Sequence, residues 1–339
     1  MRTLLAFACL AGSLLAADAR NVDLRHTDFH FTMPKYGSLP EWEARKAQLR
    51  RQILVSAGLY SLHEKMPLKP LIFGRIEREG YSIEKVALET MPGYYLGGNL
   101  YRPLHPKGKV PAILTPHGHW TYGRLENSEG YSGQALGINL ALQGYVAFGY
   151  DMVGYNDTLQ TEHRFTSPTY QLWSFTPLGL QLWNSIRALD FVESLPEVDG
   201  QRLAVTGASG GGTQTFLLAA VDDRVHAAAP VNMVSFIMQG GCPCENAPGL
   251  RVGTSNVEIA AMMAPRPMCW SPQQATGRIM CHARNIRQFV QFMIFTRNQQ
   301  RFWPKGVGAL YVRRRNPRVP GETFQLGPSN RENAFGPIR

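Results

Sequence analysis

The sequence predicts an α/β fold, doubly wound around a mostly parallel sheet. The 339 residues are 44% hydrophobic and 18% charged, which is enough to bury a large core. From Val110 to Val231, short apolar runs alternate with segments of helical periodicity, as parallel strands covered on both faces do. Residues that carry chemistry follow these runs, where such sheets place their sites. The composition excludes a disordered or collagen-like chain, and no apolar run reaches the roughly 20 residues that span a bilayer.

Each element is predicted from its own pattern. Ser38-Leu-Pro-Glu41 is a capping box that begins a helix running to about Ala57, before Gly58. Ile76 to Arg102 is predicted to be rich in strands. Later strands are predicted over 110–115, 145–150, 203–206 and 225–231, and helices over 131–143, 171–195 and 213–221.

The first residues are typical of a secretory signal peptide. Met1-Arg2 precedes an apolar stretch from Leu4 to Leu15, and Ala17-Asp18-Ala19 supplies small residues for cleavage near Ala19. We therefore expect a secreted or periplasmic protein. The expected divisions are a signal peptide over 1–19, an N-terminal helical segment over 20–75, an α/β domain over 76–268 and a basic tail over 269–339.

The strongest motif is Gly207-Ala-Ser-Gly-Gly211, which fits G-x-S-x-G between a strand-like and a helix-like segment. A tight turn there would expose the hydroxyl of Ser209 above the sheet, and the N–H of Gly210 would face a developing oxyanion. The alternative is a phosphate-binding turn, but the Lys-Ser/Thr of a P-loop and dinucleotide spacing are both lacking. We expect Ser209 to be a nucleophile.

A second loop, Pro116-His-Gly-His-Trp120, follows an earlier strand, where hydrolases with such a turn place their second oxyanion donor. We expect the backbone around His119 to take this role; an ordinary turn is the alternative. Neither His117 nor His119 is expected to be the catalytic base, because in hydrolases with this serine turn the base comes after the serine and the acid along the chain.

These segments match a known group. Residues from about Tyr81 to Met268 resemble the α/β-hydrolase superfamily, and more closely secreted bacterial acetyl xylan esterase-like hydrolases. The matching segments are Pro116–Trp120, Tyr150–Gly154, Thr206–Phe216, Gln239–Pro248 and Met263–Pro267. The resemblance implies ester hydrolysis through an acyl-enzyme on acylated plant polysaccharide, with Ser209 as nucleophile and the amides of His119 and Gly210 as oxyanion donors.

The resemblance stops near Met268, where the family continues to a triad Asp, commonly in Gly-Asp-Trp, and a later His. Here no Asp follows Asp223, and His282 is the one His beyond His226. We therefore expect an α/β-hydrolase-type sheet that is incomplete at its C-terminal edge. Glu245 follows the fourth strand and is an alternative acid, or a loop carboxylate. His282 is a weak candidate base, and His226 precedes its strand, at the wrong end of the sheet.

The tail has an unusual charge. Residues 269–339 hold 12 of the 35 Lys and Arg but 2 of the 25 Asp and Glu, so the net charge of +10 lies there and residues 1–268 are neutral. A codon frame shifted by one base from Cys269 is compatible with Gly-Asp-Trp, its Asp codon straddling Ala275 and Thr276. We hypothesise an out-of-frame translation; a true basic arm is the competing reading.

We expect no cofactor and no metal. Cys242-Pro-Cys244 could ligate an ion, but no second Cys/His pair stands at zinc-site spacing. The expected partner is an acylated carbohydrate or small ester, with no nucleic acid, no membrane span and an oligomeric state left open. Activity of this chain is expected to be very weak without the triad partners.

Alternative functions are a glucuronoyl-type esterase or peptidase on the same fold, and a non-catalytic carbohydrate-binding protein. In the binding alternative, Trp120, Trp173 and Trp183 would contact sugar; core packing of these side chains is the favoured interpretation. A nucleic-acid-binding tail is a third class, disfavoured by the lack of periodic basic faces and interleaved aromatics.

Overall fold

The computed structural model describes residues 31–60, 64–165, 167–235 and 240–269. The helices are α2 (Leu39–Ser56), η2 (Gly123–Leu125), α3 (Gly133–Leu142), α4 (Pro168–Leu172), α5 (Pro177–Ser194), α6 (Gly210–Val221) and α7 (Asn256–Ala261). The strands are β1 (Leu71–Arg78), β2 (Tyr81–Met91), β3 (Tyr94–Pro103), β4 (Val110–Leu114), β5 (Asn127–Ser128), β6 (Tyr131–Ser132), β7 (Val146–Tyr150), β8 (Val198–Ala208) and β9 (Val225–Val231).

A mixed sheet with strand order β1-β2-β3-β7-β4-β8-β9 forms the centre of the fold. Strands β7, β4, β8 and β9 are parallel neighbours, and β1, β2 and β3 extend the sheet in antiparallel register. The predicted α/β-hydrolase type of sheet is confirmed. Its carboxyl edge carries the loops that follow β4, β7, β8 and β9.

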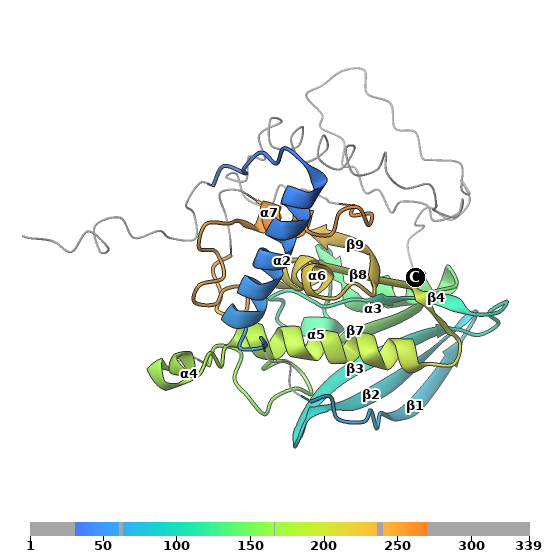
Figure 1. Ribbon diagram of the computed structural model, residues 1–339. Coiled ribbons are helices and arrows are strands. Elements are labelled where there is room, and N and C mark those ends of the chain that lie inside the picture. Colours follow the sequence, from blue (N-terminus) through green and yellow to red (C-terminus); the bar gives the residue numbers. More distant parts are fainter. Residues whose placement is uncertain (1–30, 61–63, 166, 236–239, 270–339) are drawn as a thin grey trace, which may run out of the picture.

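Helices cover both faces of this sheet (Figure 1). Helix α5 packs on β2, β4, β7 and β8 and contacts α6, while α3 packs on β2, β3 and β7. The large core cluster lies on the α5 side and includes Phe148, Trp183 and Phe216. A smaller cluster on the α3 side contains Tyr101, Leu140 and Ala147. None of the described helices is long and apolar enough to cross a membrane.

The predicted N-terminal helix is confirmed as α2. The hydroxyl of Ser38 accepts the N–H of Glu41, and the Glu41 carboxylate accepts the N–H of Gly37 at 2.7 Å. The helix therefore begins as its capping residues dictate. Strand β1 begins at Leu71, ahead of the expected start at Ile76.

The long helix predicted over 171–195 is wrong as one element. The chain forms α4 and α5 instead, with Ser174 between them at φ 53°. Thr176 is extended because Pro177 follows it, and its hydroxyl caps α5 by accepting the N–H of Gly179 at 3.0 Å. The prediction failed because the apolar residues keep a helical spacing across this break, although the backbone there is not helical.

The sheet continues past β9 by one bridge. Ala228 pairs with Met268 in parallel, and the N–H of Cys269 donates to the carbonyl of Ala228 at 2.9 Å. The Met263–Pro267 segment therefore leads to a strand position, as the family resemblance implies. The expected incompleteness of this edge concerns residues after Cys269, which lie outside the described residues.

Candidate active site

The turn after β8 holds Ser209 in a conformation that few L-residues adopt. Its φ is 57° and its ψ is −123°, and Gly210 directly begins α6. The N–H of Ser209 donates to the carbonyl of Val231 at 3.1 Å, and the residue is half-buried. Backbone strain of this kind is found at functional sites. The turn thus presents a serine hydroxyl at the carboxyl edge of the sheet.

Close packing explains the glycines around this serine. A Cβ on Gly207 would lie 2.4 Å from the carbonyl oxygen of Pro116, and one on Gly211 would lie 2.1 Å from the same atom. A Cβ on Gly212 would lie 2.7 Å from the oxygen of Val231. The turn can therefore pack against the loop after β4 and the end of β9 only when these positions lack side chains.

The loop after β4 lies against the turn. A Cβ on Gly118 would come within 2.8 Å of the Ser209 Cβ, and one on Gly210 within 3.1 Å of the His119 ring. Gly210 is the first residue of α6, so its N–H has no partner within the helix. The structure therefore brings together Ser209, Gly210 and the His119 loop, the grouping expected from the motifs.

His117 connects this loop to the loop after β7. Its Nδ1 donates to the carbonyl of Gly118 at 2.7 Å, and its Nε2 accepts the N–H of Met152 at 3.0 Å. Complete burial lowers the pKa of His117 to about 3, so the ring is neutral. Both nitrogens are occupied, which leaves His117 a structural role.

Asp151, at the carboxyl end of β7, is also occupied. It is buried and paired with Arg124, and it accepts hydrogen bonds from the Asn156 side chain and the N–H of Asp157, each at 2.9 Å. Burial raises the pKa of Asp151, while Arg124 opposes that rise. This carboxylate organises the loops around β7.

Glu245, the alternative acid of the sequence analysis, lies beside His119. Its side chain is 5% exposed, and one of its oxygens lies 3.8 Å from Nδ1 of His119. The other oxygen accepts the N–H groups of Gly241 and Cys242 at 3.0 and 3.1 Å. Glu245 therefore holds its own loop and faces an imidazole at the same time.

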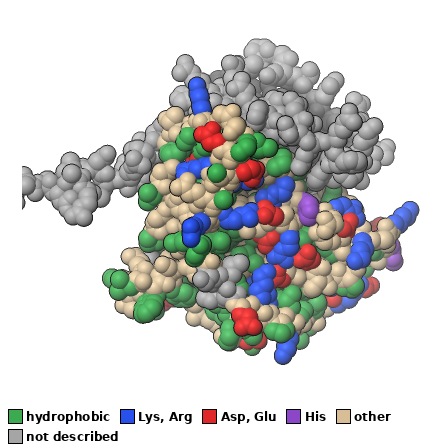
Figure 2. Space-filling model, viewed as in Figure 1, with side chains coloured by type: hydrophobic (Ala, Val, Ile, Leu, Met, Phe, Trp, Pro, Cys, Tyr) green, Lys and Arg blue, Asp and Glu red, His purple; other side chains and the backbone are tan. Residues whose placement is uncertain are grey.

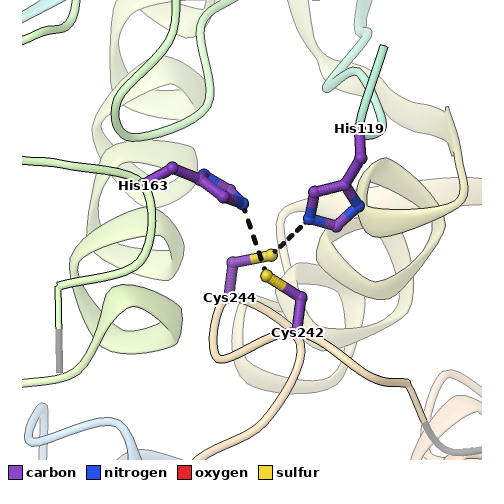
Figure 3. A group of neighbouring side chains, drawn as sticks. All are labelled: His119, His163, Cys242 and Cys244. Atoms are coloured by element: carbon purple, nitrogen blue, oxygen red, sulfur yellow. Dashed lines mark hydrogen bonds between the residues drawn. The ribbon is translucent and has the colours of Figure 1, made fainter.

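Two cysteines and two histidines meet next to this carboxylate (Figure 3). Nε2 of His119 lies 3.1 Å from Sγ of Cys244, and Nε2 of His163 lies 3.5 Å from Sγ of Cys242. Contact with Cys244 and with both imidazoles lowers the pKa of Cys242. The sequence analysis did not single out His163, because 79 residues separate it from Cys242 and no local spacing marks it.

A catalytic base for Ser209 is not evident within the described residues. His117 is occupied on both nitrogens, Nδ1 of His163 donates to the carbonyl of Val153 at 2.7 Å, and the nitrogens of His119 face Cys244 and Glu245. His226 is the second residue of β9 and so does not precede the strand, but it lies at the amino end of the strand, the end of the sheet expected for it. The candidate base His282 lies outside the described residues.

The three tryptophans considered for sugar binding have different surroundings. Trp183 is 1% exposed, and its indole N–H donates to the carbonyl of Thr90 at 2.8 Å, so core packing is confirmed there. Trp120 is half-buried and stacks on Tyr131 with 4.1 Å between ring centroids. Trp173 is 81% exposed, so core packing is wrong for it, because the break after α4 removes it from the interior.

A mixed sheet whose parallel strands carry a strained serine turn, with a neighbouring loop against the serine, is typical of the α/β-hydrolase fold. Residues 71–238 match the family model of acetyl xylan esterase (AXE1). The chain has the α/β-hydrolase type of fold and is similar to acetyl xylan esterases.

Individual proteins show the same likeness. The chain is 26% identical over 191 residues to "Putative hydrolase YtaP" of Bacillus subtilis (strain 168), covering 53% of this chain and 62% of that protein. Among solved structures, methylesterase BT1017 matches with a TM-score of 0.65 and 29% identity, over 78% of this chain and 58% of its own.

A "putative acetyl xylan esterase" from Bacteroides fragilis NCTC 9343 matches with a TM-score of 0.64 and 17% identity, over 85% of this chain and 79% of its own, and so supports the fold. The chain spans less than two thirds of the lengths of YtaP and BT1017.

Proposed function

We propose that this chain is a secreted carboxylic-ester hydrolase of the serine acyl-enzyme type, acting on acetylated carbohydrate such as xylan. The observation that carries the proposal is the strained turn at Ser209, which packs against the His119 loop. The Ser209 oxygen attacks the acetyl carbonyl, and the amides of His119 and Gly210 stabilise the oxyanion. The sugar hydroxyl then leaves, and water releases acetate from the acetyl-serine.

The same proposal includes weak turnover by the chain as written. Attack by a serine hydroxyl requires a base that accepts its proton and an acid that orients the base. Within the described residues, the histidine nitrogens near the turn face other partners, and Glu245 is the carboxylate nearest to one of them. Residual hydrolysis would come from the oxyanion amides and substrate binding.

The proposal is tested by measuring p-nitrophenyl acetate and acetylated xylan hydrolysis at high protein concentration. The expected result is a slow release above buffer that Ser209→Ala removes, while the control Ser128→Ala, an exposed serine in β5, retains it. Turnover at ordinary esterase rates would contradict the weak-activity part. Release that persists unchanged in Ser209→Ala would contradict the nucleophile.

A second candidate is a methyl-ester or glucuronoyl-type esterase. The methylesterase BT1017 matches this chain at 29% identity, and glucuronoyl esterases share its fold. Such an enzyme uses the same serine but cleaves an ester whose acyl part is the sugar acid. Release of methanol from a methyl uronate, measured beside release of acetate from acetylated xylan, separates the two substrates. The Ser209→Ala variant serves as the blank for both.

Nucleic acid is not a proposed partner. Residues 1–268 carry equal numbers of basic and acidic side chains. Figure 2 shows Lys and Arg interspersed with Asp and Glu on the face viewed. Proteins that bind nucleic acid typically carry a continuous stripe of basic residues along the phosphate backbone, and this face has none. Secretion is proposed from the signal-peptide pattern of residues 1–19, which lie outside the described residues.

A further inference from the structure

The group formed by His119, His163, Cys242 and Cys244 has a geometry that the proposed hydrolysis does not require. The four ligand atoms lie within 4.8 Å of one another, with nitrogen–sulfur separations of 3.1 and 3.5 Å. Around tetrahedral zinc, bonds of about 2.3 Å to sulfur and about 2.0 Å to nitrogen place neighbouring ligand atoms roughly 3.3–3.8 Å apart. Small side-chain shifts would bring all four atoms to bonding distance of one ion.

An acceptor oxygen lies on the Nδ1 side of each of the two histidines, and the Nε2 atoms face the sulfurs. Nδ1 of His163 donates to the Val153 carbonyl, which can only accept, so Nε2 carries a lone pair toward Cys242. For His119, the Glu245 carboxylate lies 3.8 Å from Nδ1 while Nε2 faces Cys244. Metal-binding histidines typically have such a carbonyl or carboxylate behind the ring.

We propose that His119, His163, Cys242 and Cys244 bind one zinc ion as a closed structural site. Two thiolates and two imidazoles are a donor set that selects zinc, and their charges neutralise it. Both cysteines are buried, and the His119 side chain is 26% exposed. Four protein ligands leave no position for substrate, so the ion would stabilise the fold rather than activate water.

The proposed ion would join three loops around the nucleophile turn. His119 follows β4, His163 lies in the segment after β7, and the cysteines follow β9, whereas Ser209 follows β8. The His119 ring also packs on Gly210. The site would therefore fix the loop whose backbone amide faces the oxyanion. The inference reverses the expectation of no metal, which considered local spacing alone, and it does not depend on ester hydrolysis.

The test uses the full chain, expressed with added zinc and purified without chelator under reducing conditions. Elemental analysis should find one zinc per chain, and replacement by Co²⁺ should give thiolate-to-cobalt charge-transfer absorption. Cys242→Ser/Cys244→Ser should lower the bound zinc at least tenfold and abolish that absorption. Cys269→Ser is the matched control, because Cys269 is a free cysteine outside the group, and it should keep both signals.

Three results would overturn the proposal. One is the absence of stoichiometric zinc or cobalt from the reduced native chain, a result that requires no variant to fold. Another is full metal retention by the double variant with a native far-UV circular dichroism spectrum. The last is a Cys242–Cys244 disulfide, seen as the loss of two hydrogens in the intact mass, with no metal uptake after reduction.

Discussion

Ser209 owes its conformation to the residues packed around it. Its positive φ costs backbone energy, and the absence of side chains at Gly207 and Gly211 lets the turn approach the Pro116 carbonyl. The serine motif is predictive for this reason, because the same steric requirement that fixes the turn also fixes its sequence.

Gly211→Ala should destabilise the protein by about 2–3 kcal/mol, because the new Cβ would lie 2.1 Å from the Pro116 oxygen and must displace backbone. Gly130→Ala is the control, since its Cβ would meet nothing within 4 Å. Urea unfolding measures both. Equal midpoints for the two variants would show that the turn is not as tightly packed as described.

The sequence alone predicted site residues that lie within one turn or directly after a strand. It did not predict residues that are far apart in the sequence and come together only in the fold. The sequence grouped Ser209, Gly210 and His119 because each follows a strand. It missed His163, whose only link to Cys242 is the fold itself. Core packing was also the favoured interpretation for Trp173, although that side chain is 81% exposed.

At the scale of elements, Glu258 fastens α7 to α2. The carboxylate is buried and accepts hydrogen bonds from Nε and one terminal nitrogen of Arg45, at 3.0 and 2.9 Å, and from the Thr254 hydroxyl at 2.6 Å. The Tyr36 hydroxyl donates to it as well. Burial raises the pKa of Glu258, but the bonds to Arg45, Thr254 and Tyr36 outweigh it and hold the pKa below its ordinary value.

Glu258→Gln should therefore cost about 2 kcal/mol at pH 7. A carboxyl whose folded pKa is depressed stabilises the protein above the unfolded pKa of about 4.3, and this contribution is lost as pH falls through the folded pKa. The difference in free energy of unfolding between the wild type and Glu258→Gln should accordingly become smaller below about pH 4. Glu43→Gln, which breaks a half-exposed pair with Lys46, should cost at most about 0.5 kcal/mol. If the difference in free energy of unfolding between the wild type and Glu258→Gln increased in acid, the depressed pKa of Glu258 would be wrong.

Predictions of helices and strands succeeded where the hydrophobic periodicity agreed with the residues that begin or end an element. Strand β9 spans Val225–Val231 as predicted, and α2 begins after its Ser38 cap. The 171–195 prediction failed because apolar spacing continued across Thr176-Pro177, where the proline forces extended backbone. Periodicity reports which face is buried and does not report where a helix is interrupted.

At the scale of the whole molecule, the charge of the chain changes near Cys269. Residues up to Cys269 continue the sheet beside β9 through the Ala228–Met268 bridge. The entire excess of positive charge begins there too. The change in charge agrees with the hypothesis that the chain leaves its reading frame near Cys269.

Sequencing the gene tests that hypothesis. A frame shifted by one base after the Met268 codon should encode Gly-Asp-Trp, its Asp codon straddling those of Ala275 and Thr276, and a later His. A shifted frame without those residues would favour a true basic arm instead. A salt-dependent mobility shift with DNA would then be the appropriate assay.

We propose that the Ser209 hydroxyl is an ester-cleaving nucleophile that has no catalytic base within the described residues. The test is steady-state hydrolysis of p-nitrophenyl acetate by three proteins. They are the chain as written, a chain translated in the shifted frame after Met268 (the restored chain), and the restored chain carrying Ser209→Ala. We predict that restoring the frame raises the rate by about 10³-fold or more and that Ser209→Ala removes this gain. A restored chain whose activity survives Ser209→Ala would contradict it.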